Sequence, residues 1–169
     1  MILSAFQAID RAVSQITKVL AIACFLGLSI LLGLAIVLRL APMFTIQGYD
    51  EIVELLFIWL VMITSVALWR EGVLYRGVVL ENMLSPLPRR VLEVLINLAM
   101  LVFALILVVY GWDFMQMSGE TTPFLRFDKA YWYAAIPVCG AVMAVYSVVW
   151  LWRILRGGSG LEDTTSLIN

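Results

Sequence analysis

The amino-acid sequence predicts an all-α membrane protein with four transmembrane helices, cytoplasmic N- and C-termini, and a cytoplasmic interfacial amphipathic helix between spans two and three. Three observations predict this fold class. Of the 169 residues, 63% are hydrophobic and only 14% are charged, whereas soluble domains average about 45–50% and about 25%. Long apolar runs recur along the chain, and basic residues are divided unevenly between the segments that separate them. A soluble domain of this size could not bury so much apolar surface, so the excess must face lipid.

The first span is predicted over about residues 19–38, which include no charged residue. Twenty helical residues rise about 30 Å, the thickness of the hydrocarbon core. A cleavable signal peptide would have a shorter apolar region, usually about 7–15 residues, and a small-residue cleavage site, which residues 39–42 do not provide. The preceding residues 1–18 have apolar side chains at helical spacings, which predicts a helix that either lies on the membrane surface or extends the first span.

The second and third spans are predicted over about residues 50–69 and 90–117. The second follows a short turn marked by Pro42 and Gly48 and is interrupted by Glu54. The third is longer than the bilayer requires, so we expect it to tilt or to project from the membrane.

The fourth span is predicted over about residues 131–152. Aromatic side chains at both of its ends match the aromatic belts of membrane interfaces; they are Tyr131, Trp132, Tyr133, Trp150 and Trp152. Pro137 lies in the second turn of this span, which predicts a kink or a local rearrangement of the helix.

The segment between spans two and three, residues 71–84, is too short and too charged to cross a membrane. As a helix it gathers its apolar side chains on one face, and prolines follow it at Pro86 and Pro88. This pattern predicts an amphipathic helix in the cytoplasmic interface. Glu81 falls within the apolar face, so its carboxylate must reach water or meet a cationic partner. Residues 1–156 are expected to form a single domain and residues 157–169 a flexible tail.

The basic residues predict the orientation of the chain. With the N-terminus inside, cytoplasmic segments hold most of the lysines and arginines, namely Arg11, Lys18, Arg70, Arg76, Arg89, Arg90, Arg153 and Arg156. The outer segments hold Arg39, Arg126 and Lys129. Because positive residues are retained on the cytoplasmic side, both termini are predicted to be cytoplasmic.

Composition also excludes several classes of function. The chain has no histidine, which removes bis-histidine haem, most zinc sites and the triads that need imidazole. Carboxylates and lysines remain, but they suggest no convincing catalytic set, so we expect no enzyme activity, metal or cofactor. The net charge is −1 without a basic tract, so nucleic acid is not expected as a partner. Cys24 and Cys139 are expected at different depths and therefore unpaired.

Glu54 is the main candidate for a functional residue, because charges within spans are usually functional. On the predicted helix it stacks over Asp50, and Glu51 lies one turn away, near a helix N-terminus that favours carboxylates. One interpretation is a cation site or a proton relay. The other, which we favour because no other span offers a carboxylate at this depth, is an interfacial carboxylate paired with Arg39 across the short loop.

Two tryptophans and three charged residues complete the candidate set. Trp59 lies deep in the second span, although tryptophan prefers membrane interfaces, so it packs either within the protein or on another subunit. The candidate residues for a subunit interface are Glu54, Trp59, Trp69, Arg70, Arg76 and Glu81.

The stretch from Glu51 to Arg90 carries the most specific pattern in the sequence. It contains Glu54, Leu55, Leu56, Phe57 and Trp59, then Trp69, Arg70 and Gly72, and then Arg76 and the prolines before Arg90. This pattern resembles the small membrane subunit of tripartite ATP-independent periplasmic (TRAP) transporters, the DctQ family, and the predicted topology resembles that family over nearly the whole chain.

The resemblance implies a supporting role in the bacterial inner membrane. In that family the large membrane subunit carries the substrate and sodium sites and moves as an elevator, and a soluble periplasmic protein captures the solute, often an organic acid. The small subunit is implied to be a fixed scaffold for the large one. The alternative is a small proton-coupled multidrug exporter that works as a homodimer through Glu54.

Overall fold

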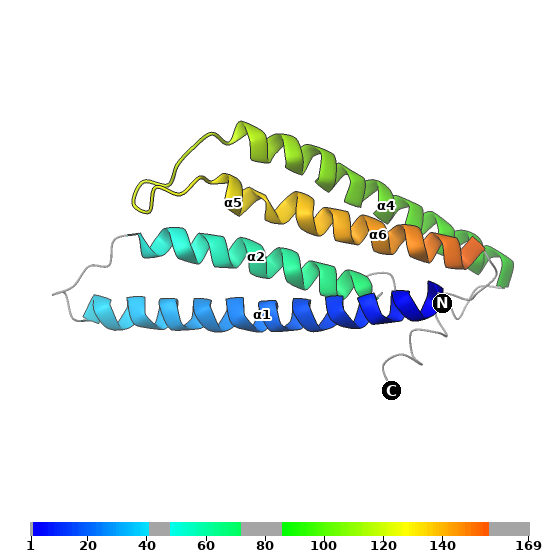
Figure 1. The fold of residues 1–169 in the computed structure, drawn as a ribbon, viewed down its shortest axis with the longest axis horizontal. Helices are drawn as coiled ribbons and strands as arrows, with labels where there is room; N and C mark the ends of the chain where they lie inside the picture. The colour runs from blue at the N-terminus through cyan, green and yellow to red at the C-terminus, as the bar shows by residue number, and fades with distance from the viewer. Residues whose placement is uncertain (1, 41–47, 72–85, 156–169) are drawn as a thin grey trace.

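The computed structural model describes residues 2–40, 48–71 and 86–155. These residues form the helices α1 (Ile2–Leu40), α2 (Tyr49–Arg70), α4 (Pro86–Met117), α5 (Ala130–Tyr133) and α6 (Ala135–Leu155), shown in Figure 1. Four stretches are long and apolar enough to cross a membrane: Asp10–Leu38, Tyr49–Arg70, Val91–Met117 and Ala130–Ile154. The prediction of an all-helical chain with four such helices is therefore confirmed for these ranges. The predicted interfacial helix, with Arg76 and Glu81, and the tail lie outside the described residues.

Helix α1 is a single uninterrupted helix, so the segment before the first predicted span extends that span. Most of its less exposed positions recur at alternating spacings of four and three, with Val13 and Gly27 beside them; they are Asp10, Ser14, Thr17, Ala21, Cys24, Leu28, Leu31, Ala35 and Leu38. This repeat of 3.5 residues is the spacing that keeps one seam of a helix against an inclined neighbour. The neighbour is α2.

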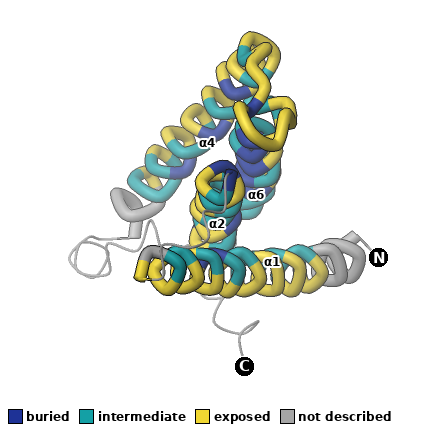
Figure 2. The backbone as a smooth tube through the Cα atoms, turned by 90° about the vertical axis from the view of Figure 1, so that its left-hand side faces the viewer, coloured by how far each residue is buried: buried dark blue, intermediate teal, exposed yellow. Residues whose placement is uncertain are grey.

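The long helices follow one another in the order α1, α2, α6 and α4 (Figure 1). Helix α1 packs mainly on α2, α2 also packs on α6, and α6 packs on α4. Figure 2 shows dark blue buried positions on α2, α4 and α6, while yellow exposed positions cover the outer sides of α1 and α4. The helices therefore form a row with two inner and two outer members.

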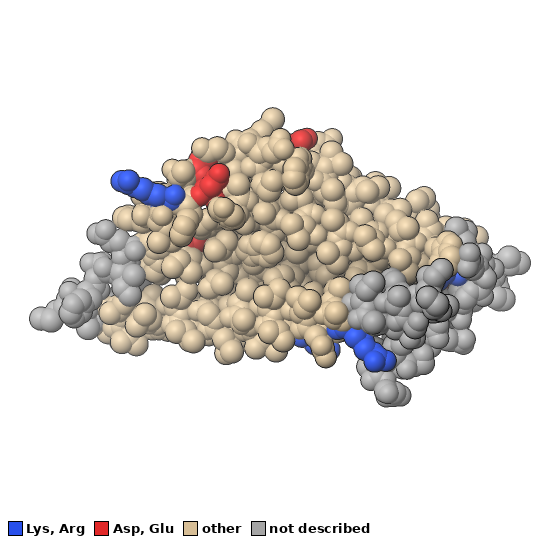
Figure 3. Space-filling model, in the orientation of Figure 1, with Lys and Arg blue, Asp and Glu red and all other residues tan. Residues whose placement is uncertain are grey.

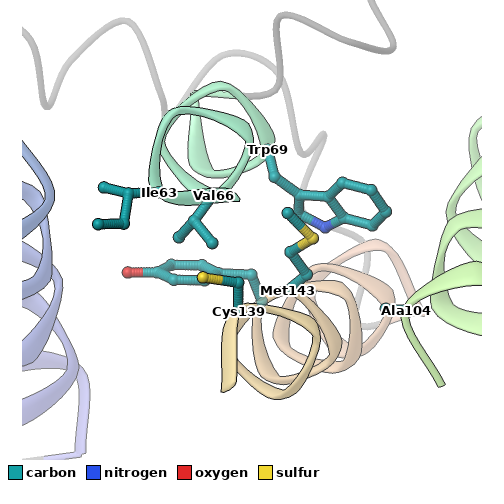
Figure 4. Close-up of a cluster of buried hydrophobic side chains, with 7 residues drawn as sticks. Ile63, Val66, Trp69, Ala104, Cys139 and Met143 are labelled. Carbon is teal, nitrogen blue, oxygen red and sulfur yellow. The ribbon is translucent and has the colours of Figure 1, made fainter. Parts of the chain in front are cut away.

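The main core lies between α2, α4 and α6. Its buried members are Ile63, Val66, Trp69, Ala104, Cys139, Met143 and Tyr146. In Figure 4, Val66 and Trp69 point from α2 toward Cys139 and Met143 on α6. Large apolar side chains and small ones alternate here, which lets the helices interdigitate.

Helices α4 and α6 approach closely because small residues lie where they meet. Ala104 on α4 is completely buried. A Cβ atom added to Gly140 on α6 would lie 3.0 Å from the Cβ of Leu107 and 3.3 Å from the backbone nitrogen of Val108. Small residues allow such contact between membrane helices, so Gly140 sets the spacing of this pair.

The fourth span is interrupted at Ala134, between α5 and α6. Pro137 accounts for the interruption, because its ring clashes with the carbonyl three to four residues earlier and it has no N–H to donate. The backbone N–H of Val138 donates to the carbonyl of Ala134 at 3.2 Å, and that of Ala134 to the carbonyl of Ala130 at 2.8 Å. The two helical pieces thus remain connected by hydrogen bonds across the break.

Candidate functional site

Three side chains form an ion-pair cluster at the end of the row where α2 finishes. The guanidinium of Arg70 donates from Nε to Oδ1 of Asp10 and from Nη2 to Oδ2, both at 2.6 Å. The hydroxyl of Tyr146 also donates to Oδ1 of Asp10, at 2.9 Å. This forked geometry is the strong, directional form of an arginine–carboxylate pair. The cluster, called here the Arg70 cluster, joins α1, α2 and α6.

A second set of hydrogen bonds beside this cluster adds α4. The indole Nε1 of Trp69 donates to the hydroxyl of Ser147 at 3.0 Å. The amide Nδ2 of Asn97 donates to the backbone carbonyl of Ser147 at 3.1 Å. The ring of Trp69 also stacks on Phe103 of α4, with ring centroids 6.3 Å apart. All four long helices are thus tied together near one end by polar contacts, which specify a single arrangement when every group is satisfied.

A buried carboxylate, Glu51, organises the opposite end of the row. Its Oε1 accepts a hydrogen bond from the backbone N–H of Phe124 at 2.8 Å, and its Oε2 accepts one from Leu125 at 3.0 Å. The backbone carbonyl of Glu51 accepts a third, from the indole of Trp132, at 3.2 Å. Glu51 is only 8% exposed. These contacts, called here the Glu51 clamp, attach α5 and the loop between α4 and α5 to the first turn of α2.

The structure places the predicted site residues in different surroundings. Glu54 is exposed on α2. Trp59 packs partly buried against the core and donates from Nε1 to the carbonyl of Tyr131 at 3.2 Å. Trp69 is buried in the core, and Arg70 lies in the Arg70 cluster. Trp69 and Arg70 therefore lie in two neighbouring sets of polar contacts, while Glu54 and Trp59 lie apart from both.

The predicted pairing of Glu54 with Arg39 stays a prediction, because the side chain of Arg39 is outside the described residues.

Sequence reasoning missed the partners that complete both polar groups. The sequence gives no indication of a partner for Asp10, and Glu51 is considered there only as a neighbour of Glu54. Asn97 and Ser147 offered a signal, since polar side chains inside apolar spans need a partner and most often find it on another helix. Which residue is the partner depends on the packing of helices distant in the sequence, which spacing along one helix does not define.

These polar groups serve to connect helices. Each contact described above joins one part of the chain to another, and every buried side-chain nitrogen or oxygen in the described ranges has a hydrogen-bond partner. Among the same residues, no three His, Cys, Asp or Glu side chains are placed to hold a metal ion. In the described residues, the polar contacts therefore link helices and a loop at both ends of the row.

The surface of this row of helices is largely apolar. Figure 3 shows few charged side chains on this face, and most of them lie toward its two ends. Exposed large hydrophobic residues are concentrated on the outer helices, for example Ile22, Ile30 and Ile36 of α1 and Leu95, Val102 and Val109 of α4. Such a surface requires lipid or another apolar protein surface around it.

Comparison with known proteins identifies the family. No characterised protein matches the sequence significantly. The profile of the tripartite ATP-independent periplasmic transporters, DctQ component, matches residues 28–157, which is most of the chain and includes the end of α1 and all of α2, α4, α5 and α6. The chain therefore belongs to the DctQ family and is the small membrane subunit of a TRAP transporter.

Proposed function

We propose that this chain is the immobile scaffold of a sodium-coupled solute importer, and that it holds the large membrane subunit in place without binding solute itself. The observation that carries the proposal is the contrast between the inside and the outside of the row. The buried polar side chains among the described residues are hydrogen-bonded within the chain, whereas the outer helices α1 and α4 expose broad apolar faces. These apolar faces suit a protein that another membrane subunit packs against.

The hydrogen bonds of the Arg70 cluster and of the Glu51 clamp support a mechanical role. A stationary partner must resist displacement when its neighbour moves, and its helices must keep their relative positions under load. The Arg70 cluster and the Glu51 clamp fix the helices near both ends, and the closely packed α4–α6 pair fixes them between. Packed interiors with satisfied polar groups have one preferred arrangement and transmit force without deforming continuously.

The proposed location is the bacterial inner membrane with both termini in the cytoplasm. In this orientation the Arg70 cluster lies on the cytoplasmic side and the Glu51 clamp on the periplasmic side. The uneven distribution of basic residues supports it. A periplasmic solute-binding protein would then approach the transporter from the side of the Glu51 clamp.

Reconstitution tests the scaffold proposal. Liposomes are prepared with this chain alone, with the large subunit alone, and with both, and each is supplied with the binding protein and a sodium gradient. We expect uptake of the solute only when both membrane subunits are present, and loss of uptake when potassium replaces sodium. Uptake by liposomes that contain this chain without the large subunit contradicts the proposal.

The exporter alternative makes a different prediction for Glu54. If this carboxylate carries protons, Glu54→Gln abolishes resistance to cationic drugs in cells that express this chain alone, whereas Asp50→Asn one turn earlier does not. Both residues are exposed on α2, which makes them a matched pair. We expect neither the chain nor its variants to confer resistance.

A further inference from the structure

The loop between α4 and α5, residues 118–129, has a defined conformation of its own. The backbone N–H of Thr122 donates to the carbonyl of Phe127 at 2.8 Å, and the N–H of Phe127 donates to the hydroxyl of Thr122 at 3.0 Å. The N–H of Lys129 donates to the carbonyl of Glu120 at 3.0 Å. Arg126 has a positive φ of 54°, a conformation that a non-glycine residue keeps only when its surroundings enforce it.

The tip of this loop is apolar and exposed. Phe124 and Phe127 expose 59% and 56% of their surface, and Leu125 exposes 37%. The Glu51 clamp holds the backbone of Phe124 and Leu125 against α2, while the side chains of both residues remain exposed. Three exposed apolar side chains on an ordered loop indicate a surface that meets an apolar environment.

The position of the loop identifies that environment. Glu51 lies in the first turn of α2, so the clamp places the tip at the level where this apolar helix begins. Figure 1 shows the loop folding back beside α2 without reaching past the nearby end of α1. That end of α1 still exposes Ile36, Val37 and Leu40. The tip therefore lies at the boundary of the apolar belt and does not project beyond it.

Basic side chains lie beside the apolar tip. Arg126 falls between Leu125 and Phe127, and Lys129 follows on the same loop. The ammonium of Lys129 lies 3.2 Å from a carboxylate oxygen of Glu120, which raises the pKa of Lys129 and keeps it charged. Aromatic rings with neighbouring lysine or arginine are typical of segments at the level of lipid headgroups, where the ring enters the acyl boundary and the cation meets phosphate.

We propose that the 118–129 loop is a membrane-interface anchor, which inserts Phe124, Leu125 and Phe127 between lipid headgroups on the side of the Glu51 clamp. Glu51 acts as a positioning residue: its carboxylate holds the loop at the depth where these side chains reach lipid. The anchor sets the height of α2, α4 and α6 in the bilayer, and it does not depend on which solute the transporter imports.

Spin-label accessibility tests the anchor. Nitroxide labels are attached to Phe127→Cys, or to Glu120→Cys as the matched control on the polar side of the loop, in a chain with Cys24→Ala and Cys139→Ala. The chains are placed in nanodiscs of phosphatidylethanolamine and phosphatidylglycerol. Power saturation then compares collisions with oxygen, which is concentrated in lipid, and with a water-soluble nickel chelate. We expect several-fold more oxygen than nickel access at position 127 and the reverse at position 120.

Other results would overturn the proposal. A label at position 127 that favours nickel shows a tip in water. A label that loses access to both reagents when the large subunit and the binding protein are added shows that a protein covers the tip instead of lipid. Adding Glu51→Gln should raise nickel access at position 127 while leaving a label at Val61→Cys, on the exposed side of α2, unchanged. If nickel access at position 127 does not change, Glu51 does not position the loop.

A second measurement does not require removal of the native cysteines. A photoreactive p-benzoylphenylalanine replaces Phe127 in the otherwise natural chain, co-expressed with the large subunit. We expect lipid adducts by mass spectrometry. Exclusive cross-linking to protein contradicts lipid insertion.

Discussion

At the scale of single residues, two carboxylates carry most of the polar connection between distant parts of the chain. Asp10 joins three helices through Arg70 and Tyr146, and Glu51 joins α2 to the 118–129 loop. Both carboxylates accept hydrogen bonds at each of their oxygens. Removing either one leaves buried or half-buried donors without an acceptor, which costs more than a typical hydrogen bond contributes.

For the Arg70 cluster, we expect Asp10→Asn to lower the free energy of unfolding by about 1–3 kcal/mol, because Arg70 loses its charged acceptor in a partly dry site. The side chains of Arg70 and Asp10 are only 21% and 16% exposed. Thermal unfolding in detergent measures the loss. Combining Asp10→Asn with Arg70→Gln should cost less than the sum of the single changes, since interacting residues couple by about 0.5–3 kcal/mol. Additive losses would contradict a direct interaction.

For the Glu51 clamp, we expect Glu51→Gln to weaken the attachment of the 118–129 loop to α2. The amide keeps one acceptor oxygen but turns an NH₂ group toward the second backbone N–H, so two donors face each other. Hydrogen exchange at the amides of Phe124 and Leu125 should accelerate about 10-fold or more, which corresponds to a loss of about 1.4 kcal/mol or more. Glu54→Gln, an exposed position on the same helix, is the control and should leave both amides unchanged.

At the scale of helices, the sequence defines where apolar segments lie more accurately than how they end. The second span was predicted over about residues 50–69, and α2 covers Tyr49–Arg70, because Gly48 with its positive φ and the charged Arg70 both interrupt the apolar run. Prolines 86 and 88 were interpreted as the end of the preceding segment, whereas α4 begins at Pro86. Proline is favoured in the first turn of a helix, where its missing N–H has no partner to lose.

Contacts between helices could not be predicted in the same way. The 3.5-residue seam of α1 is visible only when the inner face is known, because apolar residues surround this helix on all sides. The pairing of Asp10 with Arg70 and of Glu51 with the 118–129 loop depends on tertiary packing. The hydropathy pattern therefore defines the four apolar spans, whereas the Arg70 cluster and the Glu51 clamp form only when the helices pack together.

The α4–α6 contact gives a prediction at this scale. Gly140→Ala should destabilise the protein by about 1–3 kcal/mol, because the added Cβ meets the backbone of Val108 and the Cβ of Leu107. Gly33→Ala on α1 is the matched control, since a Cβ there has nothing within 4 Å, and it should be neutral or slightly stabilising. Thermal unfolding compares the two. Equal effects would mean that the close approach at Gly140 does not limit packing.

At the scale of the whole molecule, the row of helices separates an inner pair from an outer pair. Helices α2 and α6 each pack extensively on two other long helices, whereas α1 and α4 each pack mainly on one. Each outer helix presents an apolar face that a membrane or another subunit can cover. A row exposes more helix surface than a closed bundle of the same length, which suits a protein that must contact both lipid and a large partner.

The proposed orientation predicts which parts of the molecule face outward. With Cys24 and Cys139 replaced by alanine, a membrane-impermeant maleimide added to intact spheroplasts should label Glu120→Cys and not Arg11→Cys. Lysis should make the second site reactive. Both native side chains are exposed, so differences in labelling report sidedness. The reverse labelling pattern would contradict the proposed orientation and would show that the Glu51 clamp lies on the cytoplasmic side.

The pairing of neighbours in the row also bears on biosynthesis. Helix α1 contacts mainly α2, and α4 contacts mainly α6, so each half of the chain can pack as a helical hairpin by itself. We expect the contact between α2 and α6 to form last, when the second hairpin meets the first. Asp10 and Arg70 both belong to the first hairpin, so their two charges can pair within that hairpin without waiting for Tyr146 of the second.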